Sequence, residues 1–147
     1  MKASAETQRA IEAFFASYSA AYWRNDLDSI VVCFVYPCHF VSDGDPVSLI
    51  PIASEQDCRR AVERVLGWHR DIGAVSSKAT ELIVTELSPR VASVSLKSDF
   101  FDDVRRRLYD FQGIYTLVRT LHVWKIAAIS HNQIPRLVSC VSQTKVP

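Results

Sequence analysis

The stretch from Ser54 to Phe101 reads SEQDCRRAVERVLGWHRDIGAVSSKATELIVTELSPRVASVSLKSDFF, and its hydrophobic period changes near Lys78. Up to Gly73 the apolar residues recur at the three- and four-residue spacing of a helix, and from Lys78 they alternate with polar residues as in strands. Strands that follow one another without intervening helices favour antiparallel pairing. The stretch therefore predicts an α+β fold in which helices pack on a mainly antiparallel sheet.

The helical half of this stretch carries its own start and stop signals. Ser54 with Asp57 three residues later resembles a capping box, and Gly73 is typical of a C-terminal cap. The apolar stripe consists of Cys58, Ala61, Val62, Val65, Leu66 and Ile72. We expect a helix with one buried and one solvated face.

Upstream, a second stripe predicts a helix over residues 5–24. Its members are Ile11, Phe14, Phe15, Tyr18 and Tyr22. Asn25 and Asp26 interrupt the stripe and are capping residues, so a short helix from Leu27 to about Phe34 follows, which Pro37 ends.

The remaining elements are strands. Two short strands are expected before the helix at Ser54, over residues 38–42 and 47–52, and four after it, over residues 80–87, 90–101, 105–119 and 121–131. We expect a single domain over residues 1–147, with a core at about 5–132 and a tail at 133–147 that carries no clear element beyond Pro135.

Composition excludes several classes of function. Hydrophobic residues at 48% and charged residues at 22% are typical of a globular chain, and a net charge of +1 gives no field that would attract nucleic acid. No apolar run approaches the ~20 residues that cross a bilayer. The N-terminus lacks the pattern of a signal peptide, so we expect the cytosol and no membrane partner.

Metal and cofactor sites are not indicated. The cysteines, Cys33, Cys38, Cys58 and Cys140, form no C-x-x-C pair, and we expect them to be reduced. The histidines, His39, His69, His122 and His131, are scattered without metal-ligand spacing. We therefore predict no metal and no cofactor.

Three segments together point to a family. Asn25-Asp-Leu-Asp-Ser-Ile30 resembles the turn between the first helices of ketosteroid isomerase and SnoaL-like proteins, and Gly113-Ile-Tyr-Thr-Leu-Val-Arg119 with Trp124-Lys-Ile126 resembles their last two strands. The order of elements agrees over about residues 5–132. The chain thus resembles the nuclear transport factor two-like (cystatin-like) superfamily. The resemblance implies a curved sheet that forms a cone with an apolar cavity between helix and sheet, and homodimers formed through the sheet.

The isomerase site carries over only in part. Tyr18 stands where the family places its hydroxyl donor, whereas Ser42 occupies the position of the base and Thr116 that of the second oxyanion acid. Neither can replace a carboxylate, so steroid-type isomerisation is not expected. Asp43, next to Ser42, would serve as a base only if the strand slipped by one residue, and otherwise lies in a solvated turn.

The long strand at 105–119 offers a further acid. Asp110, Gln112, Ile114 and Thr116 share one phase, and the family register places that phase toward the cavity. Asp110 is then a candidate acid or base, because burial raises the pKa of a carboxyl. In the alternative, Asp110 lies beyond the rim and pairs with one of Arg105, Arg106 or Arg107.

Aromatic residues supply the expected ligand contacts. Phe14, Phe40, Trp124 and Tyr18 converge on the cavity if the fold is as predicted, and we add Ser42, Gln112, Ile114, Thr116 and Ile126 as ligand-binding candidates. In the alternative, the same aromatic rings fill the cone and leave no cavity. His39 is out of phase with Ser42 and is expected to have no role in the site.

Two hypotheses follow for function. In the first, the domain binds a small apolar metabolite, with possible isomerase, cyclase or dehydratase chemistry that uses Tyr18 with Asp43 or Asp110. In the second, it is a noncatalytic dimerisation module whose exposed sheet face includes Tyr115, Leu117 and Val123.

Overall fold

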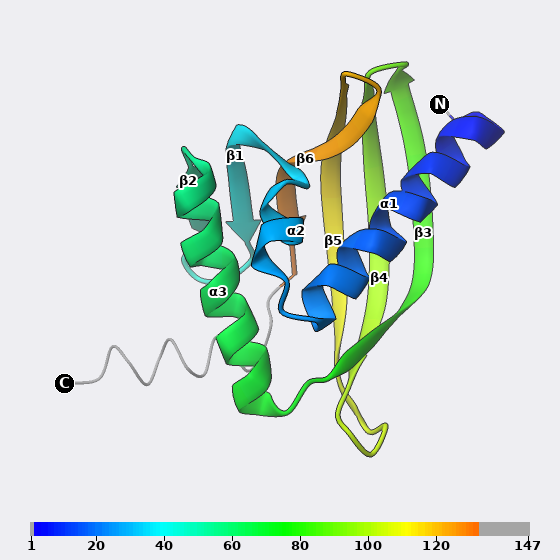
Figure 1. The fold of residues 1–147 in the computed structure, drawn as a ribbon. Helices are drawn as coiled ribbons and strands as arrows, with labels where there is room; N and C mark the ends of the chain where they lie inside the picture. The colour runs from blue at the N-terminus through cyan, green and yellow to red at the C-terminus, as the bar shows by residue number, and fades with distance from the viewer. Residues whose placement is uncertain (1, 133–147) are drawn as a thin grey trace.

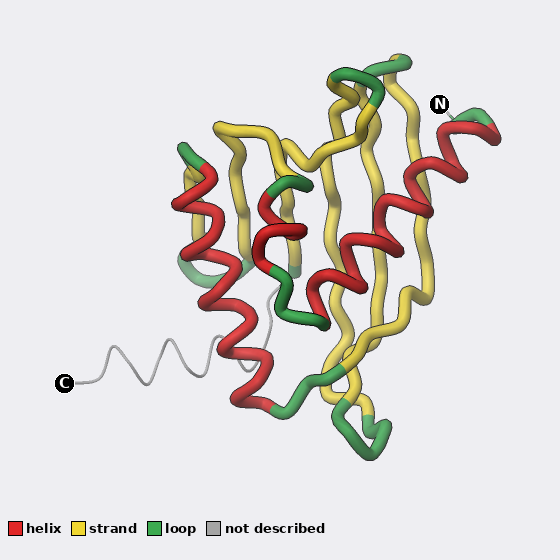
Figure 2. Tube along the Cα trace, in the orientation of Figure 1, coloured by secondary structure: helices red, strands yellow, loops and turns green. Residues whose placement is uncertain are grey.

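Three helices cover one face of a six-stranded sheet in the computed structural model, which describes residues 2–132 (Figures 1 and 2). The helices are α1 (Ala5–Trp23), α2 (Leu27–Val31) and α3 (Glu55–Ile72). The strands are β1 (Phe34–Ser42), β2 (Ser48–Ile52), β3 (Ser76–Ser88), β4 (Val91–Phe101), β5 (Arg107–Thr120) and β6 (Val123–His131). The predicted α+β class is confirmed.

The strands lie in the order β2-β1-β6-β5-β4-β3. All neighbouring pairs are antiparallel except β1 and β6, which run parallel. The long strands β3, β4 and β5 curve behind α1, and the shorter β1 and β2 lie behind α3 (Figure 1). The sheet thus forms one wall, and the helices form the opposite wall.

The predicted caps explain where α3 begins and ends. The Ser54 hydroxyl oxygen accepts a hydrogen bond from the amide of Asp57 at 3.2 Å, and Gly73 adopts the left-handed conformation with φ of 82°. Ser4 caps α1 in the same way by accepting from the amide of Thr7. Local side-chain chemistry therefore sets the ends of the helices that bound the cavity.

One element differs from its prediction. The short second helix ends at Val31, and β1 already begins at Phe34, so Pro37 lies inside a strand instead of ending a helix. The strand tolerates this proline because the pairing of β1 with β6 is interrupted between Phe34 and His39, where no ladder hydrogen bond from residue 37 is required.

The core lies between the helices and the inner face of the sheet. Ile11 of α1, Ile30 of α2 and Leu117 of β5 are fully buried there. Tyr115 and Leu117 were expected on the exposed sheet face, and that prediction is wrong, because their phase carries the large apolar side chains and turns inward. None of the described helices has the length and hydropathy to span a membrane.

Candidate functional site

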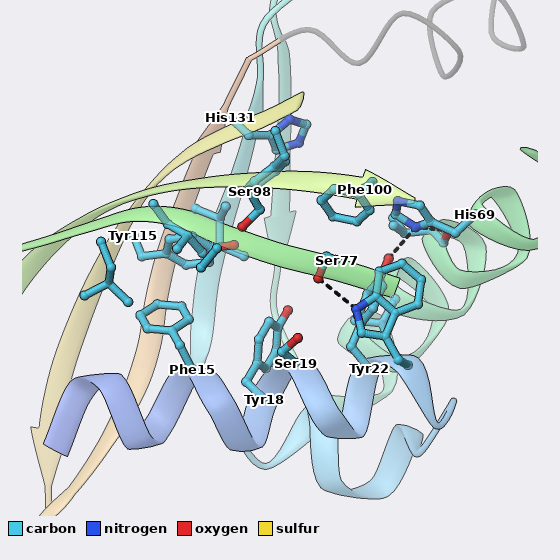
Figure 3. A pocket seen from close by; sticks show the side chains of 18 of the residues that line it. Phe15, Tyr18, Ser19, Tyr22, His69, Ser77, Ser98, Phe100, Tyr115 and His131 are labelled. Carbon is cyan, nitrogen blue, oxygen red and sulfur yellow. Dashed lines mark hydrogen bonds between the residues drawn. The ribbon is translucent and has the colours of Figure 1, made fainter. Parts of the chain in front are cut away.

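A cavity of about 600 Å³ lies between α1, α3 and the inner face of the sheet (Figure 3). Its walls are mainly aromatic and aliphatic, with Phe15, Phe34, Trp68, Phe100 and Leu96 among them. The aromatic side chains pack against one another at the walls and do not fill the space. The fold therefore encloses a hollow of the size that small-molecule sites usually have.

Small side chains open the cavity toward the surface between α1 and β3. Ala16 and Ser19 of α1 face Ser77 and Ala79 of β3 across this opening, and both alanines are exposed while also lining the cavity. The indole Nε1 of Trp23 donates a hydrogen bond to the Ser77 hydroxyl at 2.9 Å at one end of it (Figure 3). Small side chains that are partly or largely exposed therefore form this border of the cavity.

Tyr18 of α1 points into the cavity (Figure 3). Burial is the main reason that its pKa lies well above the usual value of a phenol, so the hydroxyl stays protonated at neutral pH. Within residues 2–132 no hydrogen-bond partner holds this hydroxyl. It can donate to an oxygen or nitrogen of a bound molecule.

A second polar group occupies one end of the cavity. The Nδ1 atom of His69 lies 2.5 Å from the Tyr22 hydroxyl oxygen, and its Nε2 atom lies 2.5 Å from that of Tyr109. The Nδ1 atom is also 3.1 Å from the carbonyl oxygen of Val65. Burial lowers the pKa of His69 to about 4, so the ring is neutral at pH 7, and burial raises the pKa of both tyrosines.

Charged groups are scarce in the cavity. Among the described lining residues there is no lysine or arginine, and the single carboxylate is that of Glu12, which is exposed. No group of three or more His, Cys, Asp or Glu within residues 2–132 is placed to hold a metal. The interior therefore offers neutral hydrogen-bond donors to a ligand oxygen, and its described lining residues include no buried carboxylate that could remove a proton.

A family model described as NTF2-like protein (DUF6841) matches residues 5–133. The chain belongs to this family. The match spans the whole folded core, and the predicted relationship to the nuclear transport factor two-like superfamily is confirmed. A sequence search of curated proteins finds no match.

Solved structures with the same fold include Aln2 from a Streptomyces species, with 16% identity, 95% of this chain and 99% of that chain covered, and a TM-score of 0.74. A cystatin-like protein of unknown function from Nostoc punctiforme has 11% identity, coverage of 92% and 96%, and a TM-score of 0.71. An NTF-2 like protein of unknown function from Shewanella oneidensis has 15% identity, coverage of 86% and 99%, and a TM-score of 0.69. At these identities the likeness concerns the fold alone.

The NTF2-like fold brings two of the predicted site residues to the cavity, Tyr18 and Phe40. Phe14 packs on the core beside Tyr18, with ring centroids 6.2 Å apart. Trp124 and Ile126 are buried in the core. None of these last three side chains lines the cavity, because the helices and the neighbouring strands cover them.

The remaining candidates on β1 and β5 lie away from the cavity. Ser42 ends β1. Asp43 is exposed in the turn that follows, in agreement with the predicted alternative that it lies in a solvated turn. The phase of Asp110 on β5 points to the outer face of the sheet, so its predicted orientation toward the cavity is wrong. The other members of that phase are Gln112, Ile114 and Thr116.

Hydrophobicity explains this reversal. The opposite phase of β5 carries Tyr109, Phe111 and Tyr115, whose burial is more favourable than that of Asp110 and its neighbours. The inward orientation that the resemblance implied for Thr116 is wrong, and a shift of the register by one residue moves every side chain of a strand to the other face. Nor does Asp110 form an ion pair within residues 2–132, since Arg107 pairs with Asp99 at 3.2 Å instead.

Sequence reasoning missed the polar group around His69. This residue lies three and four positions after Leu66 and Val65, on the apolar stripe of α3, where a buried side chain with two polar nitrogens requires partners. Tyr22 was placed on the stripe of α1 only as a core residue. The position of His69 on the apolar stripe therefore indicates a buried polar group. No local pattern identifies its partner Tyr109, which lies 40 residues away in the sequence.

Proposed function

We propose that this NTF2-like domain binds a small, neutral, apolar molecule in the cavity between α1, α3 and the sheet. The observation that supports this function is the hollow of about 600 Å³, which is lined by aromatic and aliphatic side chains with a few polar groups. Such a combination is the usual form of a small-molecule site. Tyr18, whose hydroxyl has no hydrogen-bond partner among the described residues, is the proposed donor to the ligand.

The charge distribution supports a neutral ligand. No lysine or arginine of the described chain lines the cavity, so a carboxylate or phosphate there would meet no permanently charged partner. Burial of an unpaired charge is strongly unfavourable. The aromatic walls, in contrast, favour a flat ring system.

The proposal is binding and not a defined reaction. Isomerase, cyclase or dehydratase chemistry with Asp43 or Asp110 is not supported, because both carboxylates face solvent outside the cavity. Tyr18 alone is a donor of a hydrogen bond and not a base.

A matched pair of serine substitutions on β4 tests the site. Ser98 is buried and points into the cavity (Figure 3). Ser95 lies on the opposite face of the same strand. Nile red, a neutral flat dye that fluoresces in apolar surroundings, is the probe. We expect the wild type and Ser95→Phe to bind it similarly, and Ser98→Phe to bind at least ~10-fold more weakly because its ring occupies the cavity. Equal binding by the two variants, or no binding by the wild type, would contradict the proposal.

The outer sheet face supports a second candidate function, homodimerisation. The register aligns Ile83, Ser95, Ile114 and Ser130 in one row across β3, β4, β5 and β6, and each isoleucine is 52% exposed. Aliphatic side chains separated by small ones form a flat surface that a second copy can cover. Val123, predicted on this face, is also 52% exposed.

Sedimentation at micromolar concentration tests the dimer. We expect the wild type to sediment as a dimer and Ile114→Lys as a monomer, because a charge at the centre of the row cannot be buried without a partner. Val104→Lys, at an exposed position in the turn between β4 and β5, is the control and should remain dimeric. A monomeric wild type would exclude this second function.

A further inference from the structure

His69 connects two tyrosines that come from different elements. The imidazole extends from the last turn of α3, Tyr22 lies near the end of α1, and Tyr109 near the start of β5. All three side chains line the cavity. Figure 3 shows His69 and the Tyr22 hydroxyl at the end of the cavity opposite Phe15.

The hydrogens of this group can be counted. A neutral imidazole has one N–H donor and one lone pair, and each tyrosine has one O–H. The ring therefore donates to one hydroxyl oxygen and accepts from the other. The hydroxyl that accepts keeps its own proton, so in either tautomer one O–H is not used within the group.

The carbonyl of Val65 selects the tautomer. Its oxygen lies 3.1 Å from Nδ1 of His69 and can only accept, so a proton on Nδ1 is favoured and a lone pair there is repelled. With Nδ1 protonated, Nε2 accepts from the Tyr109 hydroxyl at 2.5 Å. The Tyr22 oxygen, which lies 2.5 Å from Nδ1, then accepts from the Nδ1–H, and its own O–H has no acceptor among the described residues.

The neighbourhood defines what this O–H can bind. No other partner of the Tyr22 hydroxyl lies within residues 2–132, and no lysine or arginine among these residues lines the cavity. The ring of Phe100, which also lines the cavity, stacks on His69 with centroids 5.1 Å apart and planes at 10°. A neutral acceptor oxygen on a flat ring compound fits these surroundings.

We infer that Tyr22 is a second ligand-binding donor, that His69 is the residue that positions it, and that the ligand carries a carbonyl oxygen on a ring system. This inference rests on the proposed function, because it requires that the cavity holds a ligand. It adds an anchor at the end of the cavity, separate from Tyr18.

Two ligands that differ by one oxygen test the inference. α-Tetralone has a ring carbonyl, and tetralin has the same rings without it. Quenching of tryptophan fluorescence measures the dissociation constant of each ligand. The quantity compared between variants is the ratio of the two constants, tetralin over α-tetralone. We expect Tyr22→Phe to lower this ratio roughly 10-fold relative to the wild type, as expected for one buried hydrogen bond. Tyr36→Phe is the control and should leave the ratio unchanged. The Tyr36 hydroxyl does not line the cavity, and it donates a hydrogen bond of 2.7 Å to the Val31 carbonyl.

Substitutions at His69 separate positioning from packing. His69→Phe removes the Nδ1–H and should lower the ratio as Tyr22→Phe does, whereas His69→Asn places an amide N–H near the same point and should restore part of it. The carbonyl stretching band of bound α-tetralone is an independent readout. We expect it at lower frequency in the wild type and in Tyr36→Phe than in Tyr22→Phe.

The outcomes distinguish this inference from the function on which it rests. An unchanged ratio in Tyr22→Phe, or a loss of the ratio in Tyr109→Phe or Tyr18→Phe in its place, would overturn the assignment of Tyr22 even when Nile red binds and Ser98→Phe blocks it. If neither tetralin, α-tetralone nor Nile red binds the wild type, the proposed function itself is wrong and the inference with it.

Discussion

The Nε2 atom of His69 on α3 and the hydroxyl oxygen of Tyr109 on β5 lie 2.5 Å apart, with their rings inclined by only 16°. Phe100 stacks on both rings, with centroids 5.1 Å from His69 and 4.7 Å from Tyr109. This contact joins the last turn of a helix to the sheet across the end of the cavity. A buried, neutral histidine thus contributes both to the fold and to the surface that a ligand meets.

Stability should depend on pH through His69. Its folded pKa is about 4, below the usual value of 6.5, so between these two pH values the unfolded chain binds a proton that the folded chain does not. Stability is therefore fully present above pH 6.5 and is lost as the pH falls toward 4. Between pH 7 and pH 4.5 we expect the wild type to lose roughly 2–3 kcal/mol more free energy of unfolding than His69→Gln, measured with urea.

His39→Gln is the control for this titration. His39 is exposed on the outer side of β1 and does not touch the cluster around His69, so this variant should keep the pH dependence of the wild type. If His69→Gln and His39→Gln lose stability equally on acidification, the buried histidine is not the cause.

Most of the fold could be predicted because it is encoded locally. The apolar stripe of α3, with Ser54 and Gly73 at its ends, predicts the bounds of that helix. The alternation over residues 90–101 predicts β4, which begins one residue later, at Val91. These signals depend on neighbours in sequence. The start of β1 at Phe34 was missed because an interrupted pairing with β6, which lies far away in sequence, accommodates Pro37.

The site was predicted only in part because its members meet through tertiary structure. Tyr18 and Phe40 were found, since one lies on a clear helical stripe and the other on a predicted strand. The inward orientation of Asp110 depended on the family register, and the structure contradicts it, because Asp110 is exposed to solvent. In β5 the large apolar side chains share the phase of Tyr115, and their burial decides which face of the strand turns inward.

The hydrogen bond between Trp23 and Ser77 should stabilise the opening of the cavity. It joins the end of α1 to the start of β3 at 2.9 Å, in a partly buried position. Ser77→Ala leaves the indole N–H without this acceptor, and we expect a loss of about 1 kcal/mol in the free energy of unfolding. Ser76→Ala, at the adjacent exposed serine, should change stability by less than ~0.5 kcal/mol, and equal losses in the two variants would show that the hydrogen bond contributes nothing.

Gly113 maintains the shape of the cavity wall. A Cβ atom at this position would lie 2.8 Å from two ring atoms of Phe111 and 3.2 Å from the Tyr115 ring, so Gly113→Ala must push these rings aside. Because both rings line the cavity, we expect weaker binding of Nile red together with a loss of about 1–3 kcal/mol in stability. In Gly67→Ala the new Cβ meets only Arg70 at 3.5 Å inside α3, and that control should gain about 0.5–1 kcal/mol without any change in binding. Unchanged binding and stability in Gly113→Ala would mean that the rings can move away from the cavity at no cost.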